Sequence, residues 1–360
     1  MNLLSVEEKL KELKEKGIPV YSISRLNTFH SCPYEYYKTY IEGERGKNNV
    51  YGVMGTFIHD NIENIYRGVS TTEEFKKNFT DKLIELDMLN ITFPSDSIRW
   101  NWVKDVGHFI DNFKPVKTKM AIETLILFQI NGIYLQGYID AIVPSEKGYP
   151  YVNIIDWKTS SKYNGKKLLE AGRQLVLYKL GLETMTNYKV DKVMWNMIKY
   201  VNVCWKLKNG KIKKKMCSRG KWIKEMKNQL LHDLQRLSLP EFEIEFLMDQ
   251  VIEENDITHF PKEIRDKYWL EECFVEYEIT DEIIAEFVKY VTDTVKEIES
   301  RGTDPENWQP IEINNKTSFY CNHLCSHRDT CPARKAFLEA NSDKFEEKEK
   351  EKDEFSVLFG

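Results

Sequence analysis

Hydrophobic and polar positions change period along the chain, and the change separates a helical first third from a β-rich middle. Apolar residues recur at helical spacing over residues 53–66, 72–89 and 98–112. An earlier segment, capped at Ser24, continues the helical pattern through Tyr40. Each of these stretches therefore predicts an amphipathic helix.

Beginning at Ala121, the spacing becomes that of strands. The runs AIETLILFQI, IYLQGYIDAIV and YVNIIDW are separated by Asn-Gly and by SEKGYP, which are both turn signals. They predict a meander of three strands. Helical spacing returns over residues 166–182, and residues 192–207 alternate well enough to form a further strand.

The rest of the chain is again mostly helical, with helices predicted over residues 222–237, 281–299 and 332–340. This mixture predicts an α/β fold with a small mixed sheet flanked by helices. We expect five parts: a helical region at residues 1–115, a core at 116–205, a basic and helical region at 206–310, a cysteine cluster at 311–340 and a charged flexible tail at 341–360.

The composition is that of a folded protein without a membrane segment. The chain has 360 residues, 41% of them hydrophobic and 12% aromatic, which is enough to bury a full core. A run of about 18 apolar residues does not occur, and the N-terminus reads as a charged helix rather than a signal sequence. We therefore expect a soluble, cytoplasmic protein that does not associate with a membrane.

The formal net charge of -5 conceals a local basic segment. Between Lys206 and Lys227 there are ten Lys or Arg residues and one acid. Such a segment suits contacts with phosphates, and Trp205 and Trp222 would be available to stack on unpaired bases. The alternative interpretation is a solvated turn and helix face.

Candidate chemistry begins on the two strands that end in GYID and IIDWK. Alternate residues of a strand point to one face, so Asp156 and Lys158 project together, and Asp140 lies beside them if the two strands pair. Two carboxylates are hard oxygen ligands for Mg²⁺ or Mn²⁺, and a lysine can orient a water molecule. The alternative is an exposed ion pair on a hairpin.

Two further pairs have helical spacing. His59 and Glu63 share a face of one predicted helix, so His59 could complete a metal site, although a lone histidine is more often a surface or core residue. Gln174 and Tyr178 are also four residues apart, and could contact the DNA backbone or support Lys158. Ordinary amphipathic packing explains the second pair equally well.

Taken in order, these pieces resemble the motifs of the PD-(D/E)XK nucleases of the RecB-like branch. The matching motifs are S-x-S-x-L at residues 22–26 with Cys32-Pro33 after it, G-T-x-x-H-x-x-x-E at 55–63, G-x-x-D at 137–140, D-x-K at 156–158 and Q-x-x-x-Y at 174–178. The resemblance covers nearly the whole chain except the tail. It implies a restriction-endonuclease-like core.

The resemblance also implies roles for single residues. His59, Asp140, Asp156 and the backbone carbonyl of Trp157 would hold the metal, and Lys158 would position the attacking water. Asp156 stands where many members have Glu, but the family pattern allows either acid. The implied activity is that of a Mg²⁺- or Mn²⁺-dependent DNA exonuclease, acting on single strands or duplex ends in recombination, repair or replication.

Seven cysteines, an odd number, argue against a disulfide framework and for metal binding or buried thiols. The resemblance extends to the iron-sulfur branch, which includes AddB and the CRISPR-associated RecB-like nucleases, in which one N-terminal cysteine joins three near the C-terminus. Here these would be Cys32, Cys321, Cys325 and Cys331, holding a 4Fe-4S cluster. The C-x3-C spacing departs from the more usual C-x2-C and, with His323 and His327 nearby, leaves Zn²⁺ as the alternative.

Two other functions remain open from the sequence. One is a structure-specific endonuclease, which shares the same chemistry. The other is a non-catalytic DNA-binding accessory subunit that docks on a sliding clamp. The tail resembles the clamp-binding tails of some phage DNA polymerases, with Phe355, Leu358 and Phe359 as its anchors.

Overall fold

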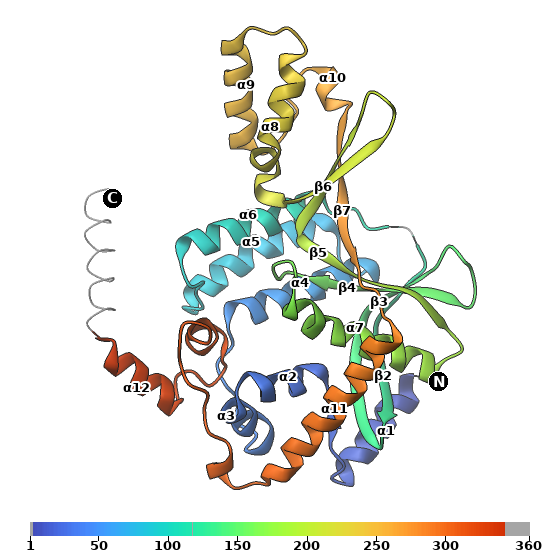
Figure 1. Cartoon of the computed structure of the whole chain (residues 1–360), viewed down its shortest axis with the longest axis vertical. Helices are drawn as coiled ribbons and strands as arrows, with labels where there is room; N and C mark the ends of the chain where they lie inside the picture. The colour runs from blue at the N-terminus through green and yellow to red at the C-terminus, as the bar shows by residue number, and fades with distance from the viewer. Residues whose placement is uncertain (1–2, 117, 343–360) are drawn as a thin grey trace. The chain divides into compact units, whose positions relative to one another are not determined.

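The computed structural model describes residues 3–116 and 118–342, which divide into two compact units. The first unit contains the chain up to Val20 and from Met54 to Phe287, and the second contains Tyr21–Val53 and the chain from Val288 onward. The predicted division into five parts stays a prediction. The helices are α1 (Leu3–Glu15), α2 (Ile23–Ser31), α3 (Pro33–Tyr36), α4 (Val50–Tyr66), α5 (Thr72–Met88), α6 (Asp96–Asn112), α7 (Lys166–Met185), α8 (Trp222–Gln235), α9 (Glu241–Glu254), α10 (Lys262–Arg265), α11 (Asp281–Arg301) and α12 (Pro332–Ala340) (Figure 1).

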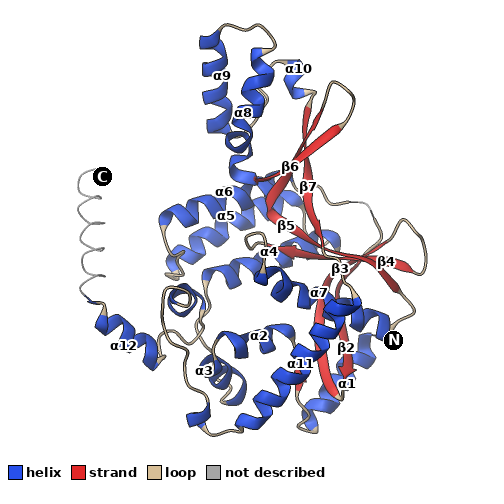
Figure 2. Ribbon diagram, viewed as in Figure 1, coloured by secondary structure: helices blue, strands red, loops and turns tan. Residues whose placement is uncertain are grey.

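The strands form a mixed sheet with helices against it, as the sequence predicts (Figure 2). β3 pairs antiparallel with both β2 and β4, β4 pairs parallel with β5, and β5 pairs antiparallel with both β6 and β7. Because α7 connects the parallel pair, β4-α7-β5 is a crossover unit. The strands are β1 (Val20–Tyr21), β2 (Ala121–Ile130), β3 (Ile133–Pro144), β4 (Tyr151–Lys158), β5 (Lys189–Lys206), β6 (Ile212–Ser218) and β7 (Tyr268–Glu276).

Two glycines allow α7 to lie close against the sheet. A Cβ atom on Gly137 of β3 would come within 2.8 Å of the Leu177 side chain, and one on Gly181 would come within 2.5 Å of Ile126. Those distances are shorter than real Cβ contacts, so any larger residue would require the neighbouring side chains to move. The close packing holds the side chains of α7 next to the strands that carry the acids.

A second hydrophobic core lies between the outer parts of β5, β6 and β7 and the helices α8 and α9, which pack side by side (Figure 1). Trp205 and Trp222 belong to this core and are 7% and 3% exposed. The prediction that these two rings stack on bases is therefore wrong. The lysines of the same segment remain at the surface, with Lys213 and Lys214 on the exposed part of β6.

The second unit brings together segments from the two ends of the chain. Trp308 is 1% exposed, and its ring stacks on Tyr36 with 5.5 Å between centroids and 9° between planes. His30 is hydrogen-bonded to Thr294 at 2.8 Å. The single helix predicted from Ser24 through Tyr40 is wrong, because the chain leaves the helix at Cys32 and α3 starts at Pro33, followed by a π-helix over Tyr37–Ile41.

Within the described residues, none of the helices is long and apolar enough to cross a bilayer. The predicted clamp-binding anchors in the tail lie outside the described residues, so that prediction stays a prediction.

His108 on α6 makes stability depend on pH. Burial and the nearby Arg219 lower the pKa of His108 to about 4, and Nδ1 has no hydrogen-bond partner among the described residues. Below pH ~6.5, His108 becomes protonated in the unfolded chain, whereas in the folded protein it stays neutral until the pH falls to about 4. The wild-type protein therefore loses stability across this window, by up to about 3 kcal/mol.

We expect His108→Gln to remove this part of the pH dependence. The stability of the variant relative to the wild type should therefore increase as the pH falls from 7 to 4.5. The free energy of unfolding in urea at several pH values measures the effect. His232→Gln, at an exposed histidine, is the matched control and should follow the wild type. Parallel pH profiles for His108→Gln and the wild type would contradict the assignment.

Candidate active site

The register of the central strands places the two predicted aspartates together. Ala141 of β3 pairs with Ile155 of β4, so the next position in the same antiparallel register sets Asp140 opposite Asp156. Asp140 is 5% exposed and Asp156 is fully buried. The sheet thus holds two carboxylates in one small volume that water barely reaches.

His59 reaches this place from α4. Its Nε2 lies 2.9 Å from the backbone carbonyl oxygen of Trp157, and its Nδ1 lies 3.4 Å from Oδ2 of Asp140. The Trp157 backbone N–H donates to that same carboxylate oxygen at 2.8 Å. Because a carbonyl only accepts hydrogen bonds, Nε2 carries the proton and Nδ1 presents its lone pair to Asp140.

Glu123 of β2 is a third acid at this place, and the sequence analysis missed it. Suitable ligand atoms of His59, Glu123 and Asp140 all lie within 4.8 Å of one another. The hairpin pairing runs through Ile122 with Ala141 and Thr124 with Ile139, and is interrupted at Glu123. Glu123 has a φ of 50°, a left-handed backbone conformation that is costly outside glycine, although the register of β2 and β3 is the same on both sides of it.

The sequence contains a signal that could have found Glu123. The turn Asn131-Gly132 has positive φ at both residues and joins Ile130 directly to its partner Ile133. Counting back along both strands from this two-residue turn sets Glu123 opposite Asp140. An acid within an apolar strand, facing a predicted metal ligand across the hairpin, is therefore recognisable from the order of residues alone.

Asp156 lacks the partners that a buried carboxylate needs. Nζ of Lys158 lies 2.8 Å from its Oδ2, but neither carboxylate oxygen accepts an aligned hydrogen bond from any residue that the structure describes. Lys158 itself is well oriented, because it also donates to Oε1 of Gln174 at 2.9 Å. Gln174 in turn donates to the Tyr178 hydroxyl at 2.6 Å.

The electrostatics of the cluster follow from burial and crowding. Burial, and then the charge of Asp156, raise the pKa of Asp140 well above its ordinary value. Burial lowers the pKa of His59 and raises that of Glu123. Burial also opposes the charge of Lys158, but the carboxylates of Asp156 and Asp140 outweigh it, so the pKa of Lys158 is raised.

This donor set fits a divalent cation. The carboxylates of Glu123 and Asp140 and the neutral imidazole of His59 offer oxygen and nitrogen ligands within 4.8 Å of one another. A cation there would also offset the repulsion between Asp140 and the adjacent carboxylate of Asp156. The residues predicted for catalysis and metal binding form two sets of contacts, which the backbone of residues 156–158 joins. One set is His59, Asp140 and the backbone of Trp157, and the other is Asp156, Lys158, Gln174 and Tyr178.

The four predicted cluster cysteines lie in the second unit and are all buried. Burial, and then Cys32 and Cys331, raise the pKa of Cys321 to about 11, so the thiols are close enough to act on one another. No three of these thiols all lie within 4.8 Å of one another. Within the described chain, the one group of metal-ligating side chains that meets this spacing is His59, Glu123 and Asp140.

Residues from the other end of the chain hold the cysteine loop. Glu35 accepts hydrogen bonds from Ser326 N at 2.7 Å, from Ser326 Oγ at 2.8 Å and from the Tyr320 hydroxyl. Asn49 donates to the carbonyl of Leu324 at 3.0 Å. His327, a possible zinc ligand from the sequence, is hydrogen-bonded through Nε2 to Thr39 at 3.0 Å.

Comparison with known proteins agrees with this geometry. None of the curated protein sequences compared with the chain matches it significantly. The family model described as the PD-(D/E)XK nuclease superfamily matches residues 20–332, a span that contains the acids, His59, Lys158 and the cysteines. The chain therefore belongs to the PD-(D/E)XK nuclease superfamily.

Proposed function

We propose that the protein is a Mg²⁺- or Mn²⁺-dependent deoxyribonuclease whose active site is the cluster around Asp140 and Asp156. The observation that carries the proposal is the buried carboxylate of Asp156. Its Oδ2 lies 2.8 Å from the ammonium of Lys158, neither of its oxygens accepts an aligned hydrogen bond within the described part of the chain, and its charge acts on Asp140, Glu123 and His59, whose ligand atoms lie within 4.8 Å of one another. Such a set is unfavourable without a cation and suited to holding one.

Each side chain has a separate role in this proposal. Asp140, Asp156, Glu123 and His59 would hold the cation, which when bound offsets phosphate charge and makes a bound water more acidic. Lys158 is held by Asp156 and Gln174, so its ammonium is oriented to donate a hydrogen bond to the attacking water. Tyr178 holds Gln174 and acts on Lys158 only through it.

We further propose that cleavage proceeds from DNA ends or along single strands, in recombination, repair or replication. Membership of the superfamily supports a nuclease, and the RecB-like motifs of the sequence support cleavage from ends or along single strands. Linear and circular single-stranded DNA of the same sequence distinguish the possibilities. An exonuclease degrades only the linear form, whereas cleavage of the circle identifies an endonuclease.

We expect Asp156→Asn and Lys158→Met to reduce the rate of DNA cleavage by at least about 10²–10³-fold, because each removes a charge that acts on the reacting groups. DNA affinity should remain close to that of the wild type. Cleavage of labelled DNA with Mg²⁺ or Mn²⁺, and DNA binding in EDTA, are the measurements. Lys166→Met, at an exposed lysine of the same helix as Gln174, is the control. Cleavage at the wild-type rate by both active-site variants would exclude the proposal, whereas a wild type that binds DNA without cleaving it would favour an accessory subunit.

For Glu123→Gln we expect opposite effects with and without metal. In EDTA the variant should be more stable by about 1 kcal/mol, or roughly 2 °C, because one of the crowded buried charges is removed. Added Mn²⁺ should raise the thermal stability of the variant less than that of the wild type, because the affinity of the variant for the ion is lower by roughly 10–100-fold. Thermal unfolding across a Mn²⁺ titration gives both values, and Glu146→Gln is an exposed control. Equal Mn²⁺ stabilisation of variant and wild type would remove Glu123 from the site.

We also propose that Cys32, Cys321, Cys325 and Cys331 hold a 4Fe-4S cluster. Tetrahedral zinc has Zn–S distances of about 2.3 Å, which sets its thiolates about 4 Å apart. Beyond the effect of burial, Cys32 and Cys331 both raise the pKa of Cys321 and of Cys325, so the four buried thiols lie near one another, and no three of them in the described chain show the close spacing that one zinc ion requires. Cys32 and Cys331 each precede a proline that starts a helix, so backbone geometry fixes both positions.

Protein purified without oxygen should be brown and contain iron and acid-labile sulfide in about equal amounts. Cys321→Ser should lose the colour and most of the iron. Cys273→Ser, at a buried cysteine of the first unit, should keep both and serves as the matched control. Colourless wild-type protein with stoichiometric zinc would overturn the iron-sulfur assignment.

A further inference from the structure

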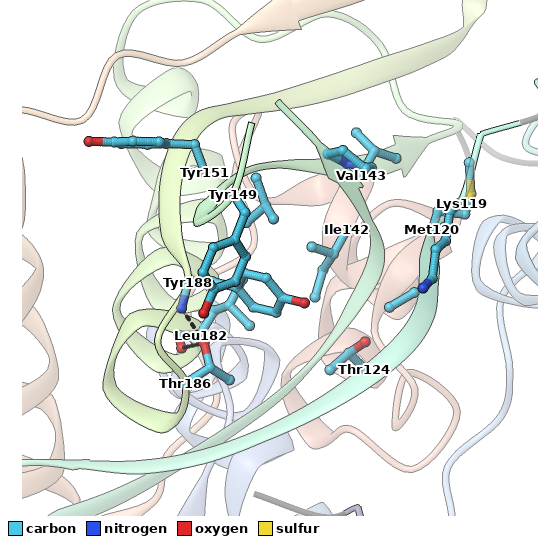
Figure 3. Close-up of a pocket in the computed structure, with 13 residues that line it drawn as sticks. Lys119, Met120, Thr124, Ile142, Val143, Tyr149, Tyr151, Leu182, Thr186 and Tyr188 are labelled. Atoms are coloured by element: carbon cyan, nitrogen blue, oxygen red, sulfur yellow. Dashed lines mark hydrogen bonds between the residues drawn. The ribbon is translucent and has the colours of Figure 1, made fainter. Parts of the chain in front are cut away.

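A cavity of about 380 Å³ opens at the end of the sheet where β3 finishes and β4 begins (Figure 3). Its apolar floor includes Ile142, Val152 and Leu182, the last from α7. Three tyrosines, Tyr149, Tyr151 and Tyr188, stand around it. The cavity lies wholly within the first unit and uses none of the side chains assigned to the proposed metal site.

The tyrosine rings are exposed rather than packed. Tyr149 is 80% exposed, and Tyr151 and Tyr188 are 40% and 39% exposed. The rings of Tyr149 and Tyr188 meet edge to face, with 6.1 Å between centroids and 71° between planes. Thr186 accepts a hydrogen bond from the Tyr188 backbone N–H at 3.1 Å, which fixes one side of the opening. Flat aromatic faces of this kind offer stacking surfaces for a planar ligand.

The charges of the lining favour an anionic ligand. The lining contains Lys119 and no acid. Outside it, Lys147 lies over the Tyr151 ring at 5.5 Å from the centroid, although it also pairs with Asp191. Stacking rings beside an ammonium group are the usual combination for binding single-stranded nucleic acid without sequence preference. An apolar protein side chain would use the floor, but would make no use of Lys119.

The position of the cavity agrees with this ligand. Along β3, Ile142 is two residues from Asp140, or about 7 Å, and along β4 Val152 is four residues from Asp156, or about 13 Å. A stacked strand advances about 3.4 Å per nucleotide. A strand with its reacting phosphate at the acids would thus place a base two to four nucleotides away at the cavity.

We infer that this cavity is a subsite for an unpaired base of the substrate strand, with Tyr149 and Tyr188 as stacking surfaces and Lys119 at the adjoining phosphate. The inference rests on the proposed DNA nuclease function and deepens it. The site reads no base edge, since its lining is mostly apolar, and so it accepts any base. It selects single-stranded DNA because only an unpaired base can enter.

The first test is binding of a fluorescent single-stranded oligonucleotide in EDTA. Tyr149→Ser combined with Tyr188→Ser should weaken binding about tenfold, the effect of one lost base–aromatic stack, and Tyr149→Phe combined with Tyr188→Phe should restore it. Phe242→Ser is the matched control, because Phe242 is 74% exposed but lies on the acidic helix α9. An oligonucleotide with one abasic site two to four nucleotides from the cleaved bond should bind the wild type and the serine variant equally.

The second test is photocrosslinking of an oligonucleotide that carries 5-iododeoxyuridine at each position in turn. Crosslinks to Tyr149 or Tyr188 from one position of the oligonucleotide support the subsite. Unchanged DNA binding by the serine variant, with crosslinks only to other residues, overturns it. The cavity would then be assigned to an apolar side chain of a protein ligand. Failure of the nuclease proposal is separate, because it appears as a wild type that does not cleave DNA. In that case tyrosine-dependent binding still supports the subsite.

Discussion

Repulsion between buried like charges is the constraint on which the site depends. Asp140, Asp156 and Glu123 are held by three adjacent strands at one place, and the lone pair of His59 points at the same carboxylates. Water is largely excluded from Asp140 and Asp156, so solvent screens the charges of these two acids only weakly, while Glu123 and His59 are half-buried. Without a cation, the raised pKa of Asp140 favours its neutral form and so reduces the repulsion between the acids. A bound cation would reduce the same repulsion while the acids are ionised.

The surrounding fold keeps this unfavourable set in place. The tight hairpin at Asn131-Gly132 fixes the register of β2 and β3, and the small residues Gly137 and Gly181 let α7 approach closely enough for Gln174 to hold Lys158. The positive φ of Glu123 adds local backbone strain. The extensive packing of the sheet and α7 offsets these costs, a division between scaffold and site that is common in enzymes.

Much of the site could be predicted from the sequence because strand geometry is regular. Period-2 alternation placed Asp156 and Lys158 on one face. His59 comes from a distant helix, so its helical spacing with Glu63 made it only a possible ligand, and the family resemblance was needed to bring it to the two aspartates. The burial of the two tryptophans was missed because it depends on tertiary packing, in which Trp205 of β5 and Trp222 of α8 enter a core with residues of α9. α9, β6 and β7 were missed because the lysines of β6 hide its alternation and because acids dominate the pattern of α9.

The second unit is discontinuous, and this has a consequence for how the protein is made. Cys32 and its neighbours leave the ribosome long before Cys321, Cys325 and Cys331, which are among the last described residues to be synthesised. The first unit is compact in itself, and nearly all of it is synthesised before the later segment of the second unit, so it can fold during translation. Closure of the second unit must await synthesis of its later segment, so the loading of any cluster there would be a late maturation step and would not begin on the early nascent polypeptide.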